Sequence, residues 1–596
     1  MSDINDFISQ YSGYTNRLEV TNTPDPSFLV SGSQNVLLDW QNSLSSRKGY
    51  ELVGAAGSTG GIKGEFTWRT NRGDFYVGRQ IGLTLQLKRT AADGTVSWVT
   101  IHDSTGGDEF DGVLSTFDTV FDDTAKIDRL VFAAGNVKFF TWRGDTTAIT
   151  ATTTNTIVGD RNLGAAGFAA SGDVVINGTT YAYTGISSDT FTGVTPDPTG
   201  EADDSLVTSP VEAETIASIP ANFTCDFIGV QRNQVYLSSE TSRIVLVSDA
   251  TDYTNFTTST AVGGPRELTL DDNGAGFLSS KKSMVIFGQE NSIFNIKKTI
   301  SADNLKEYWE VERLATSPRQ GLISPLAKIR VKNALMYVTR EKTLDMVEFV
   351  ENITDEQSVP ISDLVKNDFD RFDFTDASIS YWERNIILCI PAENLMYIYD
   401  LQRRIWQAPI TWSGATIAMC SVDENGNLIG HDAFVDSSYT LFVGKTDNGE
   451  PIISKAVFAY NNFGDRFSLK RLTKYAQDGY ISPNGILKRT LEFDYRGGNG
   501  MIEKDFAGNS PFVYNNPDAG GFGKAPLGER PLAGSSLLAT EDLRRFRYAD
   551  AVPPAEFYEL RVSYEMKTLN GQWRLVAHGS DISATNSRTN NITRTV

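Results

Sequence analysis

The sequence predicts an all-β protein. Short segments of alternating apolar and polar residues follow one another along most of the 596 residues, separated by turn dipeptides such as Asp93-Gly94. Aromatic residues make up 11% of the chain and there are 51 glycines, a composition that suits strands joined by tight turns. Because a chain of this length exceeds one ordinary core, we expect several domains or one large closed repeat architecture.

Residues 1–60 are predicted to form an N-terminal arm and a first strand. Loose polar turns come first, and they lead into the apolar run Asn35–Trp40. The segment ends in the polar stretch Ser45–Gly49. This order is typical of an extended arm that enters a sheet.

Four alternating segments after residue 61 predict one blade of a β-propeller. They cover Ile62–Trp68, Asp74–Gln80, Leu83–Leu87 and Val96–His102. Four up-and-down strands in about 40 residues form the unit of that fold. Similar units recur downstream without a fixed period, so we assign residues 61–155 and 221–450 to the propeller. An array of β-sandwiches is the competing architecture.

Residues 156–220 predict a small β domain inserted into the propeller. The hairpin Asp173–Tyr183 turns at Asn177-Gly178, a pair that favours a tight turn. The flanking stretches are small, polar and proline-containing, so we expect two flexible connections.

Residues 451–596 predict a separate C-terminal β domain. Alternating stretches surround a Gly, Pro and Asn-rich loop from Gly508 to Gly534. A loop of this length is either disordered alone or ordered against a neighbour. The polar tail Asp581–Val596 is predicted to be extended, and it either grips another subunit or frays.

The charge is acidic and unevenly distributed. The 74 acidic and 54 basic residues give a formal charge of −20, which argues against nonspecific attraction to nucleic acid or anionic lipid. Residues 101–250 hold 21 acids and 7 bases, whereas residues 451–596 hold 15 acids and 19 bases. The imbalance fits either a solvated acidic surface or ordered stacking of subunits around an acidic channel.

The sequence offers little equipment for catalysis. It has three histidines and three cysteines, and the cysteines Cys225, Cys389 and Cys420 lie far apart in apolar contexts typical of buried free thiols. Motifs for metalloproteases, serine hydrolases and phosphate-binding loops are absent, so we expect no enzyme, no metal and no cofactor. A glycosidase that uses two carboxylates stays open, although no pair can be nominated. The N-terminus lacks signal-peptide features and no stretch is long enough to span a membrane, so synthesis and solubility in the cytoplasm are expected.

An ordered set of segments resembles one known family. These segments are Leu44–Tyr50, Asn233–Leu237, Val247–Phe256, Val285–Ile293, Ser317–Pro325, Lys332–Val338 and Leu395–Trp406. Together they are similar to the β-propeller tail-nozzle family of tailed bacteriophages, also called tail tubular protein B or packaged-DNA stabilisation protein. The resemblance covers roughly residues 35–480 and depends on order and context more than on any invariant motif.

The resemblance implies a late structural protein of the virion tail. It implies a homohexameric ring below the portal and adaptor, in contact with these and with distal tail proteins. Viral DNA would be held in the lumen before infection and would pass through it during ejection without sequence-specific binding. An acidic wall would repel phosphates and let DNA slide.

Two groups of acids are candidates to line such a channel. They are Asp108, Glu109, Asp111, Asp118, Asp122 and Asp123, and Asp368, Asp370 and Asp373. Solvated surface loops are the simpler interpretation. A Ca²⁺ site is a further alternative, although neither cluster matches a calcium-binding loop.

Basic residues near the C-terminus are candidates for contact with an acidic face of a neighbouring subunit. They are Lys470, Arg471, Lys474, Arg544, Arg545 and Arg547. Ordinary charge on a strand surface is the alternative.

A second class of function is a receptor-binding or carbohydrate-contacting tail fibre or tailspike. Exposed aromatics would then serve as stacking platforms for sugars. The tryptophans considered for this role are Trp142, Trp382, Trp406 and Trp412. Core packing is the simpler interpretation of all four.

Overall fold

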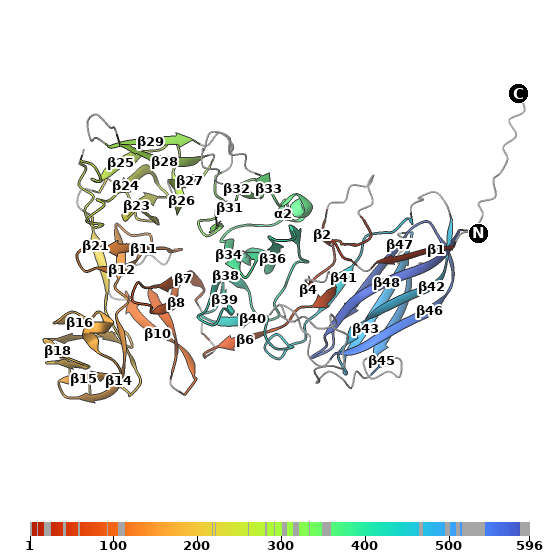
Figure 1. The fold of residues 1–596 in the computed structure, drawn as a ribbon, viewed down its shortest axis with the longest axis horizontal. Helices are drawn as coiled ribbons and strands as arrows, with labels where there is room; N and C mark the ends of the chain where they lie inside the picture. The colour runs from red at the N-terminus through yellow and green to blue at the C-terminus, as the bar shows by residue number, and fades with distance from the viewer. Residues whose placement is uncertain are drawn as a thin grey trace, which may run out of the picture.

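The computed structural model confirms the all-β class. It describes residues 3–8, 10–16, 25–39, 43–55, 57, 60–91, 93–104, 114–216, 219–220, 222–259, 261–279, 283–290, 292–300, 307–313, 321–332, 334–348, 359–463, 469–494, 501–507, 513–514 and 543–584. Within these residues the strands form a propeller, a domain inserted into it and a two-sheet sandwich (Figure 1).

The predicted β-propeller is confirmed, and the described residues give it seven four-stranded blades. The predicted first blade corresponds to blade 1. The blades comprise, in ring order, β7 (Ile62–Arg69), β8 (Phe75–Ile81), β9 (Thr84–Thr90) and β10 (Val96–Asp103); β11 (Thr116–Asp122), β12 (Ile127–Ala133), β13 (Lys138–Trp142) and β21 (Val211–Thr215); β22 (Phe227–Gln231), β23 (Gln234–Ser239), β24 (Ser242–Val247) and β25 (Arg266–Thr269); β26 (Gly274–Ser279), β27 (Met284–Gly288), β28 (Ile293–Ile300) and β29 (Glu307–Arg313); β30 (Lys328–Val331), β31 (Ala334–Val338), β32 (Leu344–Glu348) and β33 (Val359–Pro360); β34 (Ser378–Trp382), β35 (Asn385–Ile390), β36 (Leu395–Asp400) and β37 (Ile405–Trp406); and β38 (Ile417–Val422), β39 (Leu428–Asp432), β40 (Ser438–Leu441) and β6 (Tyr50–Val53).

The ring closes through a strand from the other end of the domain. β6 pairs with β40, with Leu441 opposite Tyr50, and so completes blade 7. Contacts between β38 and β7 then join blade 7 to blade 1. Closure removes the open sheet edges that a row of blades would otherwise present.

The inserted domain lies between β13 and β21 of blade 2. Its sheet comprises, in spatial order, β17 (Thr179–Tyr183), β16 (Gly172–Ile176), β20 (Leu206–Thr208), β14 (Thr146–Thr153), β15 (Thr156–Gly159), β19 (Thr190–Thr192) and β18 (Gly185–Ser187), with one short helix, α1 (Leu163–Ala166). The hairpin at Asn177 is present. The predicted range of 156–220 is displaced, because β14 belongs to the insert and β21 is the outer strand of blade 2.

The C-terminal domain is a sandwich that also contains strands from the N-terminus. One sheet has the order β4 (Val36–Leu38), β5 (Leu44–Ser46), β48 (Trp573–Ala584), β42 (Lys470–Ile481), β46 (Arg544–Phe557) and β45 (Val513–Tyr514), with β1 (Asp3–Ile8) paired to β48. The other sheet has the order β41 (Ser454–Val457), β47 (Leu560–Met566), β43 (Ile486–Phe493) and β44 (Met501–Ala507).

The predicted arm of residues 1–60 is therefore divided between two domains. β1, β4 and β5 lie in the sandwich, whereas β6 lies in the propeller. Two further short strands, β2 (Gly13–Tyr14) and β3 (Phe28–Leu29), pair with each other in parallel. Of the predicted tail, residues 581–584 belong to β48, and residues 585–596 lie outside the described residues. Most of the predicted loop 508–534 also lies outside them.

One hydrophobic core joins the propeller to the sandwich. It includes Tyr397 and Trp406 of blade 6, Tyr14 of the N-terminal segment, and Tyr564 and Trp573 of the sandwich, all at most 2% exposed. Short helices between blades 5 and 6, η1 (Asp363–Val365) and α2 (Lys366–Phe369), add Val365 and Phe369 to it, and a third, η2 (Pro391–Glu393), lies in blade 6. Continuous burial of this kind resists relative movement of the two parts.

Arg47 adds a buried ion pair at the same joint. It lies between β5 and β6, and its guanidinium contacts both carboxylate oxygens of Asp447 at 2.8 and 2.6 Å. The remaining N–H groups donate to the Asn35 side chain and to the carbonyls of Lys48 and Thr411. The group also stacks 4.1 Å from the ring centre of Trp412. All five donors of the guanidinium are therefore used.

The predicted buried free thiols are confirmed. Cys225, Cys389 and Cys420 are all free and buried. The sulfurs of Cys389 and Cys420 lie 3.8 Å apart between blades 6 and 7. None of the helices among the described residues is long and apolar enough to cross a membrane.

We expect Arg47→Met to destabilise the protein by about 3–5 kcal/mol, because it leaves the Asp447 carboxylate buried without its partner. Urea denaturation followed by tryptophan fluorescence measures the loss. Arg384→Met, at an exposed position, is the matched control and should change stability by less than about 0.5 kcal/mol. A loss as small as that of the control would show that the ion pair does not hold the joint.

Candidate functional site

The axial cavity of the propeller is the candidate functional site. The inner strands β7, β11, β22, β26, β30, β34 and β38 contact one another in a ring, and all seven contribute residues to a cavity of about 440 Å³. Phe66, Phe117, Phe277 and Leu326 give it apolar walls, and four ionisable side chains project from two sides. Such a combination is typical of small-molecule sites.

Two acids line the cavity from neighbouring blades. Glu65 comes from β7 and Asp118 from β11. Burial raises the pKa of Glu65 to about 8. Burial also raises the pKa of Asp118 to about 6, although the N–H groups of Thr119 and Val230 donate to its carboxylate at 2.8 and 2.6 Å and oppose the shift. Both groups gain a proton more readily than an exposed carboxyl does.

Two bases line the cavity from β30. Lys328 donates to the carbonyl of Pro325, and burial lowers the pKa of its ammonium to about 7. Its chain lies over Gly276, where a Cβ would come within 2.6 Å of Nζ. Arg330 donates to the carbonyls of Ser279 at 2.9 Å and Lys332 at 3.3 Å. A side chain at position 276 would therefore displace the end of the lysine.

Two hydroxyl groups of the cavity wall are engaged with the backbone. Ser378 and Ser380 each donate to a carbonyl of β38 at 2.6 Å. His431 and His578 lie elsewhere, fully buried, and burial lowers the pKa of each to about 3. The arrangement can bind polar groups, and its lining residues include no serine or cysteine paired with a histidine.

The cavity is too small for a nucleic-acid duplex. Its volume falls in the range of small-molecule pockets, about 300–1,000 Å³. A duplex is wider than its own major groove, which is about 12 Å wide and about 8.5 Å deep. A passage of that width through the propeller would need a larger volume. Asp118 therefore lines the axial cavity of the propeller itself, which is too small to conduct DNA.

The other nominated acids within the described residues do not converge on one surface. In an up-and-down blade, the turn after the inner strand lies on one face of the propeller, and the link to the next blade lies on the opposite face. Asp122 and Asp123 follow the inner strand β11. Asp368, Asp370 and Asp373 lie in the link between blades 5 and 6. The two groups thus lie on opposite faces of the propeller.

Their local roles also differ. Asp122 is buried, pairs with Arg129 at 2.9 Å and accepts two turn N–H groups. Asp368 accepts the hydroxyl groups of Tyr14 and Tyr397 at 2.7 and 3.1 Å, at the joint with the N-terminal segment. Asp123, Asp370 and Asp373 are exposed, and Asp108, Glu109 and Asp111 lie outside the described residues. Among the nominated acids that the structure describes, the exposed three could face a lumen without rearrangement.

The nominated bases lie on two paired strands but at their opposite ends. Lys470 pairs with Phe557, whereas Ile481 pairs with Arg544 at the far end of β42 and β46. Lys470 is buried at 2% exposure, and Arg545 forms an ion pair with Asp478 at 3.1 Å. Arg471 and Lys474 are exposed, and the side chains of Arg544 and Arg547 are outside the described set. The bases do not form one patch.

The four tryptophans considered as sugar platforms are buried. Trp142, Trp382, Trp406 and Trp412 are 0 to 3% exposed. Three of their indole N–H groups donate to backbone carbonyls. The prediction that sugars stack on these residues is therefore wrong, and the four tryptophans pack in the core. No group of three or more His, Cys, Asp and Glu side chains within the described residues is placed to hold a metal ion.

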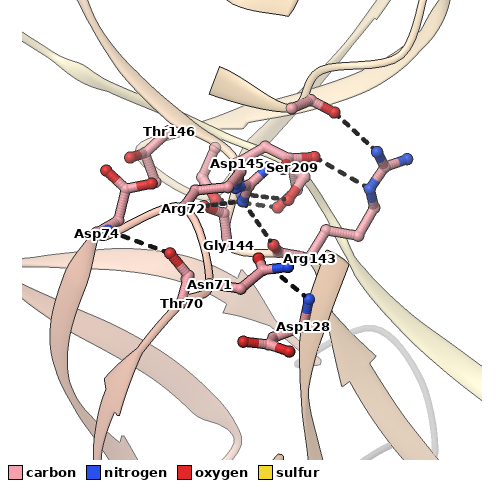
Figure 2. A network of polar contacts seen from close by, with 12 residues as sticks. Thr70, Asn71, Arg72, Asp74, Asp128, Arg143, Gly144, Asp145, Thr146 and Ser209 are labelled. Atoms are coloured by element: carbon pink, nitrogen blue, oxygen red, sulfur yellow. Dashed lines mark hydrogen bonds and ion pairs between the residues drawn. The ribbon is translucent and has the colours of Figure 1, made fainter. Parts of the chain in front are cut away.

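A polar network anchors the inserted domain, as Figure 2 shows. Asp145 is 1% exposed, accepts a hydrogen bond from Arg72 at 2.5 Å and forms an ion pair with Nε of Arg143 at 3.0 Å. Arg72 also donates to the carbonyls of Arg143 and Gly144, and the N–H of Ser209 donates to the carbonyl of Asp145. Both connections are thus held by hydrogen bonds, and the stretches predicted to be flexible connections contain β14, β15 and β20 of the insert itself.

Sequence reasoning missed Arg47, Glu65, Asp145 and Lys328. Each is a single charged residue in or beside a strand, a pattern that normally indicates a solvent-facing position. The signal available was weak: Lys328 and Arg330 alternate with apolar residues on a short strand. Which side of a closed ring they face depends on contacts that the sequence does not display.

The known proteins that this chain resembles are distant from it in sequence. No family model and no curated protein matches the chain. Among solved structures, it is similar to the WD40 β-propeller domain of Doa1, with 9% identity, a TM-score of 0.34, and coverage of 66% of this chain and 97% of that one. It is also similar to selenomethionine-substituted virginiamycin B lyase from Staphylococcus aureus, with 10% identity, a TM-score of 0.36, and coverage of 66% and 99%.

Glu65→Gln should change how stability depends on pH. A folded-state pKa of about 8 means that the folded protein holds this proton more tightly than the unfolded chain, so the wild type loses stability as pH rises from about 5 to 8. Asp118 acts in the same direction up to about pH 6, and Lys328 acts in the opposite direction above about pH 7.

In urea denaturation, the free energy of unfolding of Glu65→Gln should exceed that of the wild type by about 1–2 kcal/mol between pH 5.5 and 8. This gain is smaller than the full pKa shift of Glu65 would give, because water reaches the cavity. Glu51→Gln, at an exposed position of β6, should show no such gain. Equal behaviour of the two variants would mean that Glu65 titrates like a surface carboxyl.

Asp145→Asn should loosen the inserted domain, because two guanidinium groups lose the carboxylate between them. We expect a loss of about 2–4 kcal/mol for opening of this domain, seen as faster amide exchange and faster proteolysis within residues 146–208. Asp173→Asn, exposed on the same domain, is the control. Unchanged exchange in both variants would contradict an anchoring role of the network.

Proposed function

We propose that this protein is a structural subunit of a bacteriophage tail nozzle, which assembles as a ring that retains packaged DNA and conducts it during ejection. The proposal rests first on the resemblance carried by segments such as Leu44–Tyr50 and Leu395–Trp406. The alternative, a tail fibre or tailspike that stacks sugars on tryptophan, lost its nominated platforms because all four are buried.

The rigid connection between the domains is the observation that carries the proposal. One core spans blade 6, the N-terminal segment and the sandwich, and the Arg47 ion pair crosses the same joint. A ring that holds DNA under load needs subunits whose parts do not pivot, because interdomain movement would open gaps in the wall. The anchored insert supports the same interpretation.

The conduit in this proposal lies between subunits. A single propeller offers an axial cavity of about 440 Å³, which excludes a duplex. DNA would therefore pass along an axis that several copies surround. The exposed acids on one propeller face, either Asp123 or the pair Asp370 and Asp373, are the candidates to face it.

Purified protein should form a ring of six copies of the 65.5 kDa chain, alone or together with an adaptor ring. Mass photometry gives the number of copies, and cryo-electron microscopy gives the symmetry and the position of the central opening. A monomer, or a trimer located at the tail periphery, would overturn the proposal.

Charge reversal should identify the lumen face. Asp123→Lys and the double variant Asp370→Lys/Asp373→Lys change exposed acids on opposite propeller faces, so each serves as the control for the other. Substitution of the acids that face the lumen should leave ring assembly intact and slow DNA release several-fold, because lysines bind phosphates by releasing counterions. Unchanged release in both variants would contradict an acidic lumen formed by these residues.

A further inference from the structure

The charges of the axial cavity are separated by sign. The acids Glu65 and Asp118 come from blades 1 and 2, whereas the bases Lys328 and Arg330 both come from blade 5. In a ring of seven blades, blade 5 lies across the axis from blades 1 and 2. The cavity therefore has an acidic side and a basic side, with the apolar side chains of Ile228 and Phe277, from blades 3 and 4, between them.

The four side chains retain capacity to bind a ligand. The ammonium of Lys328 has three donors, and among the described residues its recorded hydrogen bond is to the carbonyl of Pro325. Within the same residues, the Glu65 carboxyl has no recorded hydrogen bond or ion pair. Asp118 accepts two backbone N–H groups through different oxygens, which leaves lone pairs on each.

Burial without a full set of partners favours the neutral forms of Glu65 and Lys328. The pKa of Glu65 is raised to about 8 and that of Lys328 is lowered to about 7, because charges in the cavity lack compensation. A ligand that brings the opposite charge to each side would restore both ionised forms. Two complementary ends are needed, since a single charge would satisfy one side only.

We propose that the axial cavity binds a small zwitterion of the amino-acid class, with its carboxylate at Lys328 and Arg330 and its ammonium group at Glu65 and Asp118. The apolar walls suit an aliphatic spacer between the two charges. The volume admits such a molecule with accompanying water. This site is independent of ring assembly, because every lining residue belongs to one subunit.

The test uses ω-amino acids on the full-length protein. Isothermal titration calorimetry with glycine, 4-aminobutyrate and 6-aminohexanoate should detect binding of at least one of them. For the compound that binds best, the matched carboxylate without the amine and the matched amine without the carboxylate should each bind about tenfold more weakly or worse.

Substitutions of Glu65 and Lys328 test which residues bind each charged end of the zwitterion. Glu65→Gln and Lys328→Met should each weaken binding of the best zwitterion by about tenfold or more. Lys332→Met removes an exposed lysine one residue after β30 and should leave binding unchanged. Circular dichroism melting of each variant shows whether it folds. If Lys328→Met does not fold, Glu65→Gln still tests the proposal.

Three outcomes would overturn the proposal. Equal binding of the simple carboxylate would make the cavity an anion site, and equal binding of the simple amine would make it a cation site. Absence of binding for all three zwitterions would leave it a water-filled core. Because binding is measured on purified protein whether or not rings form, failure here and failure of ring assembly remain distinguishable.

Discussion

The guanidinium of Arg47 fixes the relation between the two largest parts of the molecule. Its bidentate contact with Asp447, three further hydrogen bonds and the ring of Trp412 use every donor and one face of the group. A lysine could not reproduce this set, because it offers a point charge with three donors. The residues that follow Arg47 enter β6, which pairs with β40 and closes the propeller. The contact between propeller and sandwich and the closure of the ring therefore depend on residues that are close together in the sequence.

A second buried carboxylate performs a comparable task at the insert. Asp145 lies between Arg72 of blade 1 and Arg143 at the end of blade 2, and Arg89 of blade 1 reaches Asp204 of the insert at 2.6 Å. Ion pairs with hydrogen-bond geometry add a directional constraint to the close packing of the apolar core. The protein thus uses hydrophobic burial for blade stacking and ion pairs where a domain must keep one orientation.

The blades were predictable because their information is local. Alternation and turn residues define β7 to β10 within about 40 residues of sequence. The place of the N-terminal strands was not predictable, because β5 pairs with β48 at the far end of the sequence, where Ser45 lies opposite Arg574. The cavity charges were hidden for a related reason: Glu65 alternates with apolar residues as a solvent-facing residue would, and only ring closure turns it inward. Asp122, nominated from the density of acids around it, has a local role instead, because it accepts turn N–H groups.

The location of both chain ends in the sandwich has a consequence during synthesis. Leu44 of β5 is made more than 500 residues before Leu575, its partner in β48. At about 5–20 residues per second, the N-terminal strands wait roughly half a minute to two minutes for the strand that covers them, while blades 1 to 6 can already form. Ribosome-bound chains therefore expose a hydrophobic strand edge for that whole interval, and only chains translated through β48 can conceal it.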